Sequence, residues 1–180
     1  MWEHGGVDVE GIPRAFVNNL TGGSTQGAST LTQQYVKNVL IEQAVRDGDV
    51  MAQHEAKADT LGRKAREAKL AISLEKKMGK EEILQGYLNI AQFGRSVYGV
   101  ETAARHYFGV SAKDLNYLQA ATIAGITKAP STYDPTADPE KAQNRRNVVL
   151  NTMYQQGSLS KEEDDAGLAT PIAATLGIQP

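Results

Sequence analysis

The chain has 180 residues, no cysteine, 41% apolar and 22% charged residues, and a formal net charge of −2. This length suits one ordinary domain with a hydrophobic core, and the apolar fraction argues against wholesale disorder. The lack of cysteine excludes a disulfide framework, a thiolate nucleophile and a zinc ribbon.

Helical periodicity dominates the first half, and no segment alternates as a strand does. A Gly/Ser/Thr-rich loop at 21–28 precedes a helix that we expect to run from about Ser29 into the early 40s, capped by Ser29 or Thr30. A polar turn follows at 46–49. One long helix is then predicted over roughly 53–78, with Gly79 as its C-terminal cap.

The second half continues in helices. One runs from Lys80 to about residue 90 with an apolar stripe, a second begins at a Ser111 cap and ends near residue 126, and a third covers 139–156. Ser160 and Glu163 form a capping box for a short last helix, and the final ten residues read as a linker. We therefore predict a mostly α fold, with one domain over 1–157 and a short helix with the start of a linker over 158–180.

The charge is unevenly distributed. Residues 57–80 hold eight Lys or Arg and three acids, a balance of +5, which leaves −7 for the rest of the chain. Such a segment suits phosphate-bearing ligands, nucleic acid or an anionic membrane surface, and a solvated amphipathic helix is the plainer alternative. No apolar stretch is long enough to span a membrane, and no signal peptide is visible, so we expect any anchor to lie outside this chain.

The glycine loop and helix start at 27–37 form the first candidate site. Free backbone N–H groups at a helix start favour an anion. Gln33 and Lys37 lie four residues apart, so they share one helical face and could present an amide and an ammonium to one ligand. A well-capped amphipathic helix explains the same pattern.

A second candidate site lies at 63–67. Arg63 and Lys64 precede Glu67 by four and three residues, so one helical face would present a carboxylate framed by two cations, with room for phosphate oxygens beside it. An exposed ion pair worth only ~0.3–0.5 kcal/mol is the alternative.

Three further polar residues stand near apolar runs. Asn89 ends the helix that begins at Lys80, and Arg145 with Arg146 precedes Val148, so the arginines could reach a site while the apolar residues pack. The three histidines share no metal-ligand spacing, and we predict no zinc site.

Taken in order, these motifs resemble the peptidoglycan glycosyltransferase (transglycosylase) module of class A penicillin-binding proteins. Residues 2–8 (WEHGGVD) resemble the end of the family's first motif, E-D-x-x-F-x-x-H-x-G-V-D. The segments that match the other four are GASTLTQQ at 27–34, RKARE at 63–67, KEEILQGYLN at 80–89 and RRNVVL at 145–150. Each motif is weak alone, and five in succession over about 150 residues are specific.

The resemblance implies a lysozyme-like helical fold and the polymerisation of lipid II, an undecaprenyl-pyrophosphate-linked disaccharide-peptide, into glycan strands. In the family the acceptor 4-hydroxyl displaces the lipid pyrophosphate with inversion, on the extracytoplasmic face of the bacterial cell membrane. The implied partners are lipid II, the growing strand, the membrane surface and a penicillin-binding transpeptidase domain.

The resemblance also implies roles for single residues. Glu67 matches the family's second acid, expected near the leaving group or a divalent metal ion (Mg²⁺ or Mn²⁺), and no other cofactor is expected. The residues implied in substrate binding are Ser29, Thr30, Gln33, Lys37, Arg63, Lys64, Asn89, Arg145 and Arg146.

The family's general base, the Glu of the leading E-D, would stand four residues before Met1. We therefore expect the 180-residue chain to be impaired in turnover, since loss of a general base costs ~10²–10⁴-fold. Two alternatives stay open, a lysozyme-like glycan hydrolase and a non-catalytic module that binds lipid II. Nucleic acid is not expected, because the basic residues lack interleaved aromatics.

Overall fold

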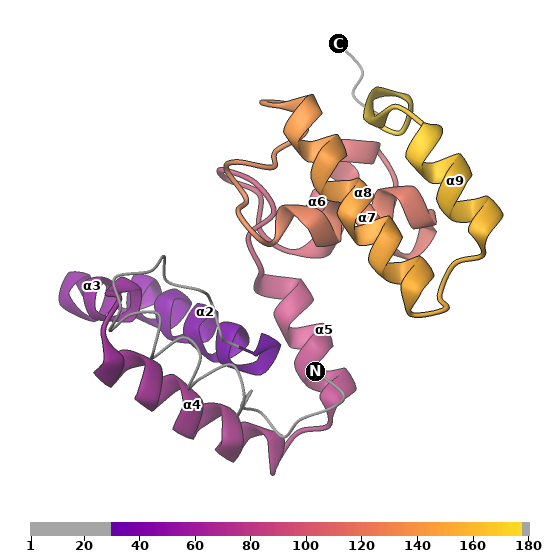
Figure 1. Ribbon diagram of the computed structural model, residues 1–180. Coiled ribbons are helices and arrows are strands. Elements are labelled where there is room, and N and C mark those ends of the chain that lie inside the picture. Colours follow the sequence, from indigo (N-terminus) through magenta and orange to yellow (C-terminus); the bar gives the residue numbers. More distant parts are fainter. Residues whose placement is uncertain (1–29, 178–180) are drawn as a thin grey trace, which may run out of the picture. The chain divides into compact units, whose positions relative to one another are not determined.

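Helices make up nearly all the regular structure in residues 30–177, the part of the chain that the computed structural model describes (Figure 1). These residues contain no β-strand, only one isolated antiparallel bridge between Gln92 and Tyr98. The chain divides into two compact units that meet between Ile90 and Ala91. The mostly α expectation is therefore confirmed, and each unit is described by itself.

The described part of the first unit consists of four helices, α2 (Leu31–Arg46), α3 (Val50–Lys57), α4 (Leu61–Glu75) and α5 (Lys80–Ile90) (Figure 1). Helix α2 packs against each of the other three. The side chains that carry the candidate chemistry lie on α4, and α2 and α3 supply the surfaces around them.

The start of α2 is fixed by its own first residues. The Thr30 hydroxyl accepts a hydrogen bond from the Gln33 N–H at 3.2 Å, and the Gln33 side chain accepts one from the Thr30 N–H at 3.0 Å. This capping box satisfies two backbone donors that a helix start otherwise leaves unpaired. The prediction of a cap at Ser29 or Thr30 is confirmed at Thr30.

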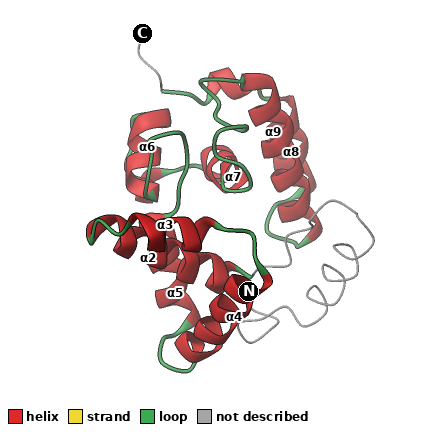
Figure 2. Cartoon of the chain, turned by 90° about the vertical axis from the view of Figure 1, so that its left-hand side faces the viewer, coloured by secondary structure: helices red, strands yellow, loops and turns green. Residues whose placement is uncertain are grey.

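The predicted single helix over 53–78 is wrong, because the chain breaks between Lys57 and Leu61. Ala58 has extended backbone angles, and the Thr60 hydroxyl accepts a hydrogen bond from the Arg63 N–H at 3.2 Å. Thr60 is thus a second N-cap, which starts α4 independently of α3. Figure 2 shows α3 and α4 as separate helices. The polar turn predicted at 46–49 is confirmed between α2 and α3, where Gly48 adopts a φ of 68°.

Helix α5 covers the range predicted for it, but Gly79 is not the C-terminal cap of the helix before it. Helix α4 already ends at Glu75, and the Gly79 N–H donates to the carboxylate of Glu82 at 2.8 Å. The middle of α5 lies close to α2, since a Cβ at Gly86 would stand 2.6 Å from the Tyr35 hydroxyl oxygen. Only glycine permits this close approach.

Helices α2 and α4 run antiparallel. The hydroxyl of Thr32, near the start of α2, donates to the carboxylate of Glu75, at the end of α4, at 2.5 Å. Leu40, two turns further along α2, lies beside Arg66 and Glu67 near the start of α4. The two helices therefore share a lengthwise interface.

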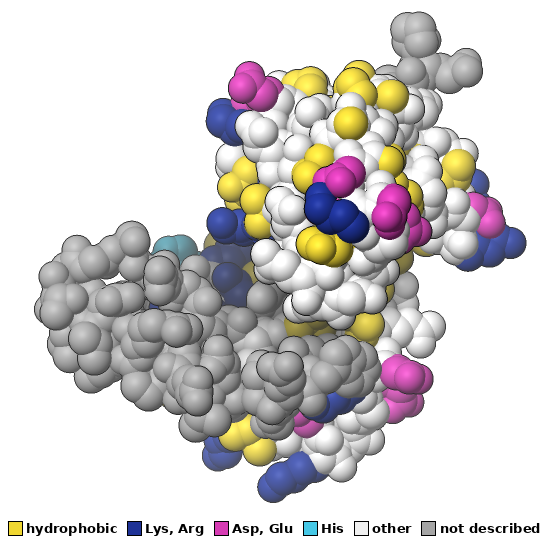
Figure 3. Space-filling model, turned by 45° about the vertical axis from the view of Figure 1, so that its right-hand side comes forward, with side chains coloured by type: hydrophobic (Ala, Val, Ile, Leu, Met, Phe, Trp, Pro, Cys, Tyr) yellow, Lys and Arg dark blue, Asp and Glu magenta, His cyan; other side chains and the backbone are white. Residues whose placement is uncertain are grey.

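The second unit contains α6 (Val100–Phe108), α7 (Tyr117–Ile126), α8 (Pro139–Gln155) and α9 (Lys161–Ala169), with short 3₁₀ turns at Ala112–Asp114 and Ile172–Ala174. The Ser111 cap was wrong: Asn116 caps α7 and forms a capping box with Gln119, and Ser111 begins the first 3₁₀ turn without a side-chain capping bond. On the face shown in Figure 3, charged side chains of this unit alternate with apolar ones, as on a solvated surface.

The last two helices follow the sequence prediction. Asp138 caps α8, which ends one residue before the predicted Gln156, and Ser160 with Glu163 forms the expected capping box of α9. Leu150 of α8 and Leu159 before α9 lie in one buried cluster. Ile172 is also buried, so the segment expected to start a linker packs on this unit at that residue. The boundary at 157/158 stays a prediction.

Candidate functional site

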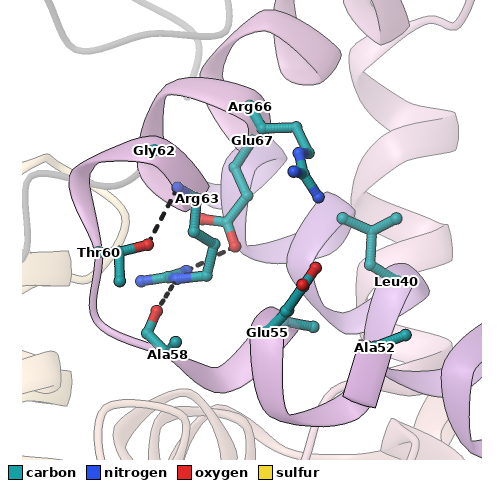
Figure 4. A pocket seen from close by; sticks show the side chains of 10 residues that line it. Leu40, Ala52, Glu55, Ala58, Thr60, Gly62, Arg63, Arg66 and Glu67 are labelled. Carbon is teal, nitrogen blue, oxygen red and sulfur yellow. Dashed lines mark hydrogen bonds and ion pairs between the residues drawn. The ribbon is translucent and has the colours of Figure 1, made fainter. Parts of the chain in front are cut away.

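A cavity of about 390 Å³ opens in the first unit, beside the start of α4 (Figure 4). Two arginines (Arg63 and Arg66) and two glutamates (Glu55 and Glu67) line it, and we call it the cationic cavity after its arginines. It is lined by α3, by the loop after it, by α4 and by one residue of α2: Leu40, Ala52, Glu55, Ala56, Ala58, Thr60, Gly62, Arg63, Arg66 and Glu67. The break between α3 and α4 shapes it, because Ala58 and Thr60 form part of its wall.

Arg63 and Glu67 form a nearly buried ion pair in this cavity. A terminal guanidinium nitrogen of Arg63 lies 2.5 Å from a carboxylate oxygen of Glu67, and the side chains are 13% and 5% exposed. The Arg63 Nε also donates to the carbonyl of Ala58 (Figure 4). The guanidinium is therefore held from two sides, so the pairing of Arg63 with Glu67 is not the exposed, weak ion pair of the alternative reading.

Lys64 does not frame Glu67 in the way the spacing predicted. Its ammonium lies 2.8 Å from the carboxylate of Asp59, which stands just before the α4 cap. This hydrogen bond and the charge of Lys64 hold the pKa of Asp59 below its ordinary value. Lys64 is not among the residues that line the cationic cavity.

Arg66 is the cavity cation that the sequence analysis overlooked. Its side chain extends from α4 toward Leu40 and Glu55 (Figure 4), and it makes no ion pair with any residue in the described range. A signal was available, because Arg66 follows Arg63 by three residues and so lies on the same side of α4. Glu55 lines the same cavity but forms no ion pair with Arg66, so a bound anion would meet this guanidinium with a carboxylate nearby.

The residues predicted on α2 do not line the cavity. Thr30 and Gln33 are buried and joined in the capping box, and Ser29 lies outside the described residues. Lys37 is half-buried and close enough to Asp59 for its charge to lower the pKa of that carboxyl. Gln33 and Lys37 therefore do not present an amide and an ammonium together to a ligand. The Gln33 side chain is buried, and its amide oxygen accepts the capping hydrogen bond from the Thr30 N–H.

The remaining candidates lie elsewhere. Asn89 is exposed at the end of α5. Arg145, in the second unit, is half-buried, and its Nε donates to the carbonyl of Gly125 at 3.4 Å. Arg146 is completely buried and donates to the carbonyls of Gly167 and Thr170 at 3.1 and 2.7 Å. Arg146 therefore presents no surface to a ligand in this structure and instead holds the end of α9 against α8.

The described residues offer no ready metal centre. No group of three or more His, Asp or Glu side chains within them is placed to hold a metal ion. Glu67, the acid expected near a divalent ion, is already paired with Arg63. In the same range, no helix is long and apolar enough to cross a membrane.

Comparison with known proteins decides the family. The model of the transglycosylase family matches residues 1–154. The chain belongs to the transglycosylase family. The transglycosylase domain is 41% identical over 178 residues to penicillin-binding protein 1A of Streptococcus pneumoniae, covering 99% of this chain and 23% of that protein. It is 43% identical over 175 residues to penicillin-binding protein 1A of Haemophilus influenzae, covering 97% of this chain and 19% of that protein.

A crystal structure of the H. influenzae protein superposes on this transglycosylase domain with a TM-score of 0.49 and 32% sequence identity. The match covers 77% of this chain and 16% of the chain in that crystal structure. The chain thus spans about a fifth to a quarter of the length of the curated relatives it matches. The resemblance read from the five motifs is confirmed at the level of the family.

Proposed function

We propose that this chain is a peptidoglycan glycosyltransferase domain that polymerises lipid II into glycan strands. In the reaction the 4-hydroxyl oxygen of the acceptor sugar forms a bond to C1 of the donor, with inversion at that carbon. The bond between C1 and the pyrophosphate oxygen breaks, and undecaprenyl pyrophosphate leaves with the electron pair. A base accepts the hydroxyl proton.

The observation that supports this proposal most is the cationic cavity in a transglycosylase domain. A departing pyrophosphate gains negative charge as its bond to C1 breaks, and fixed guanidinium groups stabilise that charge without reorganising. Arg66 is directed into the cavity and has no described counter-ion, so it can bind a phosphate oxygen. Arg63 lies beside it in a fixed orientation.

Glu67 acts in this proposal through Arg63. With 5% of its side chain exposed and one oxygen 2.5 Å from the guanidinium, it is better placed to orient that cation than to accept a proton from a sugar. We therefore assign Glu67 a positioning role and assign the base to no residue in the described range. A divalent cation stays a prediction, and no step of the proposal uses one.

Binding and turnover of lipid II test the proposal separately. The 180-residue chain is incubated with lipid II, and bound lipid and glycan strand length are measured. Arg66→Ala should weaken binding about tenfold or more, because a hydrogen bond to a charged group contributes about 1.5–3 kcal/mol. The matched control is Arg105→Ala, which removes an exposed arginine paired with Glu101 in the second unit and should leave binding unchanged.

Three other results would redirect the assignment. Lack of lipid II binding together with lack of strand formation contradicts the proposal. Because the 180-residue chain is expected to be impaired, binding without turnover favours the non-catalytic module only if turnover is still absent after the family's E-D segment is added before Met1. Release of soluble muropeptides from purified cell wall favours a glycan hydrolase.

The cellular setting is part of the same proposal. The relatives are named penicillin-binding proteins and are four to five times longer than this chain, which supports a transpeptidase domain as a covalent partner. A lipid-linked donor supports action at the extracytoplasmic surface of the bacterial cell membrane.

A further inference from the structure

The cationic cavity contains two carboxylates, and only one of them has a partner among residues 30–177. Glu67 is 5% exposed and is paired with Arg63 at 2.5 Å. The Glu55 side chain, which comes from α3, is exposed, and its carboxylate makes no hydrogen bond or ion pair with any residue in that range. The charge of Glu55 is therefore available to act on a ligand that enters the cavity.

Glu55 and Arg66 face the same part of the cavity. Figure 4 shows the Arg66 side chain extending from α4 and the Glu55 side chain extending from α3, with Leu40 of α2 beside both. Within the described residues neither charged group is paired elsewhere, and the two form no ion pair with each other. Because opposite charges attract across several ångströms, the Glu55 carboxylate weakens the positive potential that Arg66 offers to an anion.

Helix α3 is held loosely, so Glu55 has room to approach Arg66. No side chain of α3 is buried, and the helix is bounded by a turn in which Gly48 adopts a φ of 68° and by the break before α4. Its side-chain hydrogen bond to α2 comes from Gln53, whose Nε2 donates to the carbonyl of Ala44 at 3.3 Å. Segments with few buried contacts move more readily than the core. A change of rotamer or a small movement of α3 would bring the Glu55 carboxylate to Arg66.

We propose that Glu55 competes with the pyrophosphate for Arg66 and so promotes release of the leaving group. This inference rests on the proposed function and adds a residue that limits how tightly the cationic cavity holds an anion. As the bond to C1 breaks, the electron pair stays on the pyrophosphate, and the added charge strengthens its attraction to the guanidinium. Release of product limits turnover in many enzymes. A carboxylate that pairs with Arg66 as the pyrophosphate leaves lowers the barrier to that step, and Glu55 lies in the same cavity.

A double-mutant cycle with inorganic pyrophosphate tests the competition without requiring turnover. Calorimetry at low ionic strength measures binding to the 180-residue chain, to Glu55→Gln, to Arg66→Gln and to the double variant. We expect Glu55→Gln to raise the affinity about threefold to tenfold, because it removes a negative charge and keeps the size of the side chain. In the Arg66→Gln background the same substitution should change the affinity less than about twofold, because the cation under competition is gone. An equal gain in both backgrounds overturns the proposal.

Glu81→Gln is the matched control. Glu81 is an exposed glutamate in the first turn of α5, in the same unit as the cavity but not among the residues that line it. Its substitution makes the same change in net charge, and we expect the pyrophosphate affinity to stay within about twofold of the unsubstituted chain. A gain equal to that of Glu55→Gln would mean that net charge alone sets the affinity, and would overturn the proposal. Thermal unfolding of each variant checks that all of them fold.

The outcomes separate this inference from the proposed function. If lipid II and pyrophosphate bind and Glu55→Gln leaves the pyrophosphate affinity unchanged, the role of Glu55 fails and the proposed function stands. If Glu55→Gln weakens binding, Glu55 holds Arg66 in position and does not compete with the anion, so the inference is wrong. If neither lipid II nor pyrophosphate binds, the proposed function fails and this inference fails with it.

Discussion

Replacing Arg146 by Met separates a structural role from a substrate-binding role. The substitution removes the hydrogen bonds of the guanidinium to the Asn147 side chain and to the carbonyls of Gly167 and Thr170. The two bonds to the buried carbonyls are worth about 1.5–3 kcal/mol each. Part of this is offset, because burial lowers the pKa of Arg146 and its Nη1 has no hydrogen-bond partner in the described part of the chain. We expect a net loss of about 2–4 kcal/mol in the free energy of unfolding.

Thermal unfolding followed by circular dichroism measures this loss. For a chain of this size about 2–4 kcal/mol corresponds to a fall in Tm of roughly 4–16 °C. Arg145→Met is the matched control, since its one described hydrogen bond, to the Gly125 carbonyl, is 3.4 Å long, and we expect a change within about 0.5 kcal/mol. An unchanged Tm for Arg146→Met, combined with weaker lipid II binding, would refute the structural reading.

Three further substitutions, with Gly79→Ala as a control, test a close helix contact, a helix cap and a buried tyrosine, each within one unit. Gly86→Ala places a Cβ 2.6 Å from the Tyr35 hydroxyl oxygen and should destabilise by about 1–3 kcal/mol in urea unfolding, whereas Gly79→Ala, with no atom nearer than 3.6 Å, should change little. Thr60→Ala removes the cap of α4 and should lower the urea midpoint by the equivalent of about 1 kcal/mol. Burial raises the pKa of the Tyr107 phenol above its value in the unfolded chain. Above about pH 10 the phenol therefore loses its proton in the unfolded state but keeps it in the folded state, so the free energy of unfolding falls as the pH rises. Tyr107→Phe should make this alkaline loss shallower, measured as the change in urea midpoint between about pH 9 and about pH 11.

The parts of the fold that could be predicted are those fixed by contacts within one helical turn. The caps at Thr30, Asp138 and Ser160 were found because a side chain and a backbone N–H three residues away settle the outcome locally. The cap at Thr60 follows the same rule, but the charged residues on both sides fit an uninterrupted helix equally well. Ser111 was expected to cap the helix that ends near residue 126, but Asn116 forms the capping box that starts α7.

In the candidate site too, only the contacts within one helix could be predicted from the sequence. The spacing of Arg63 and Glu67 gave their ion pair, because both residues lie on one helix. The partner of Lys64 lies before the α4 cap, where the path of the chain depends on the break. The burial of Arg146 could have been predicted. Ala142 and Leu150 lie four residues before and after it on the same face of α8, and both are core residues.

The break between α3 and α4 also determines where this domain can change length. Because α4 begins at its own cap, the direction in which each of its side chains points depends on its distance in sequence from Thr60 and not on α3. Residues added to the loop at 47–49 or to α3 would leave Arg63, Arg66 and Glu67 facing the same way. A single residue inserted just after the cap would turn that face by about 100° and direct all three side chains elsewhere. The direction of these three side chains is therefore set by their spacing from Thr60, whereas α3 contributes only to the wall of the cavity that they enter.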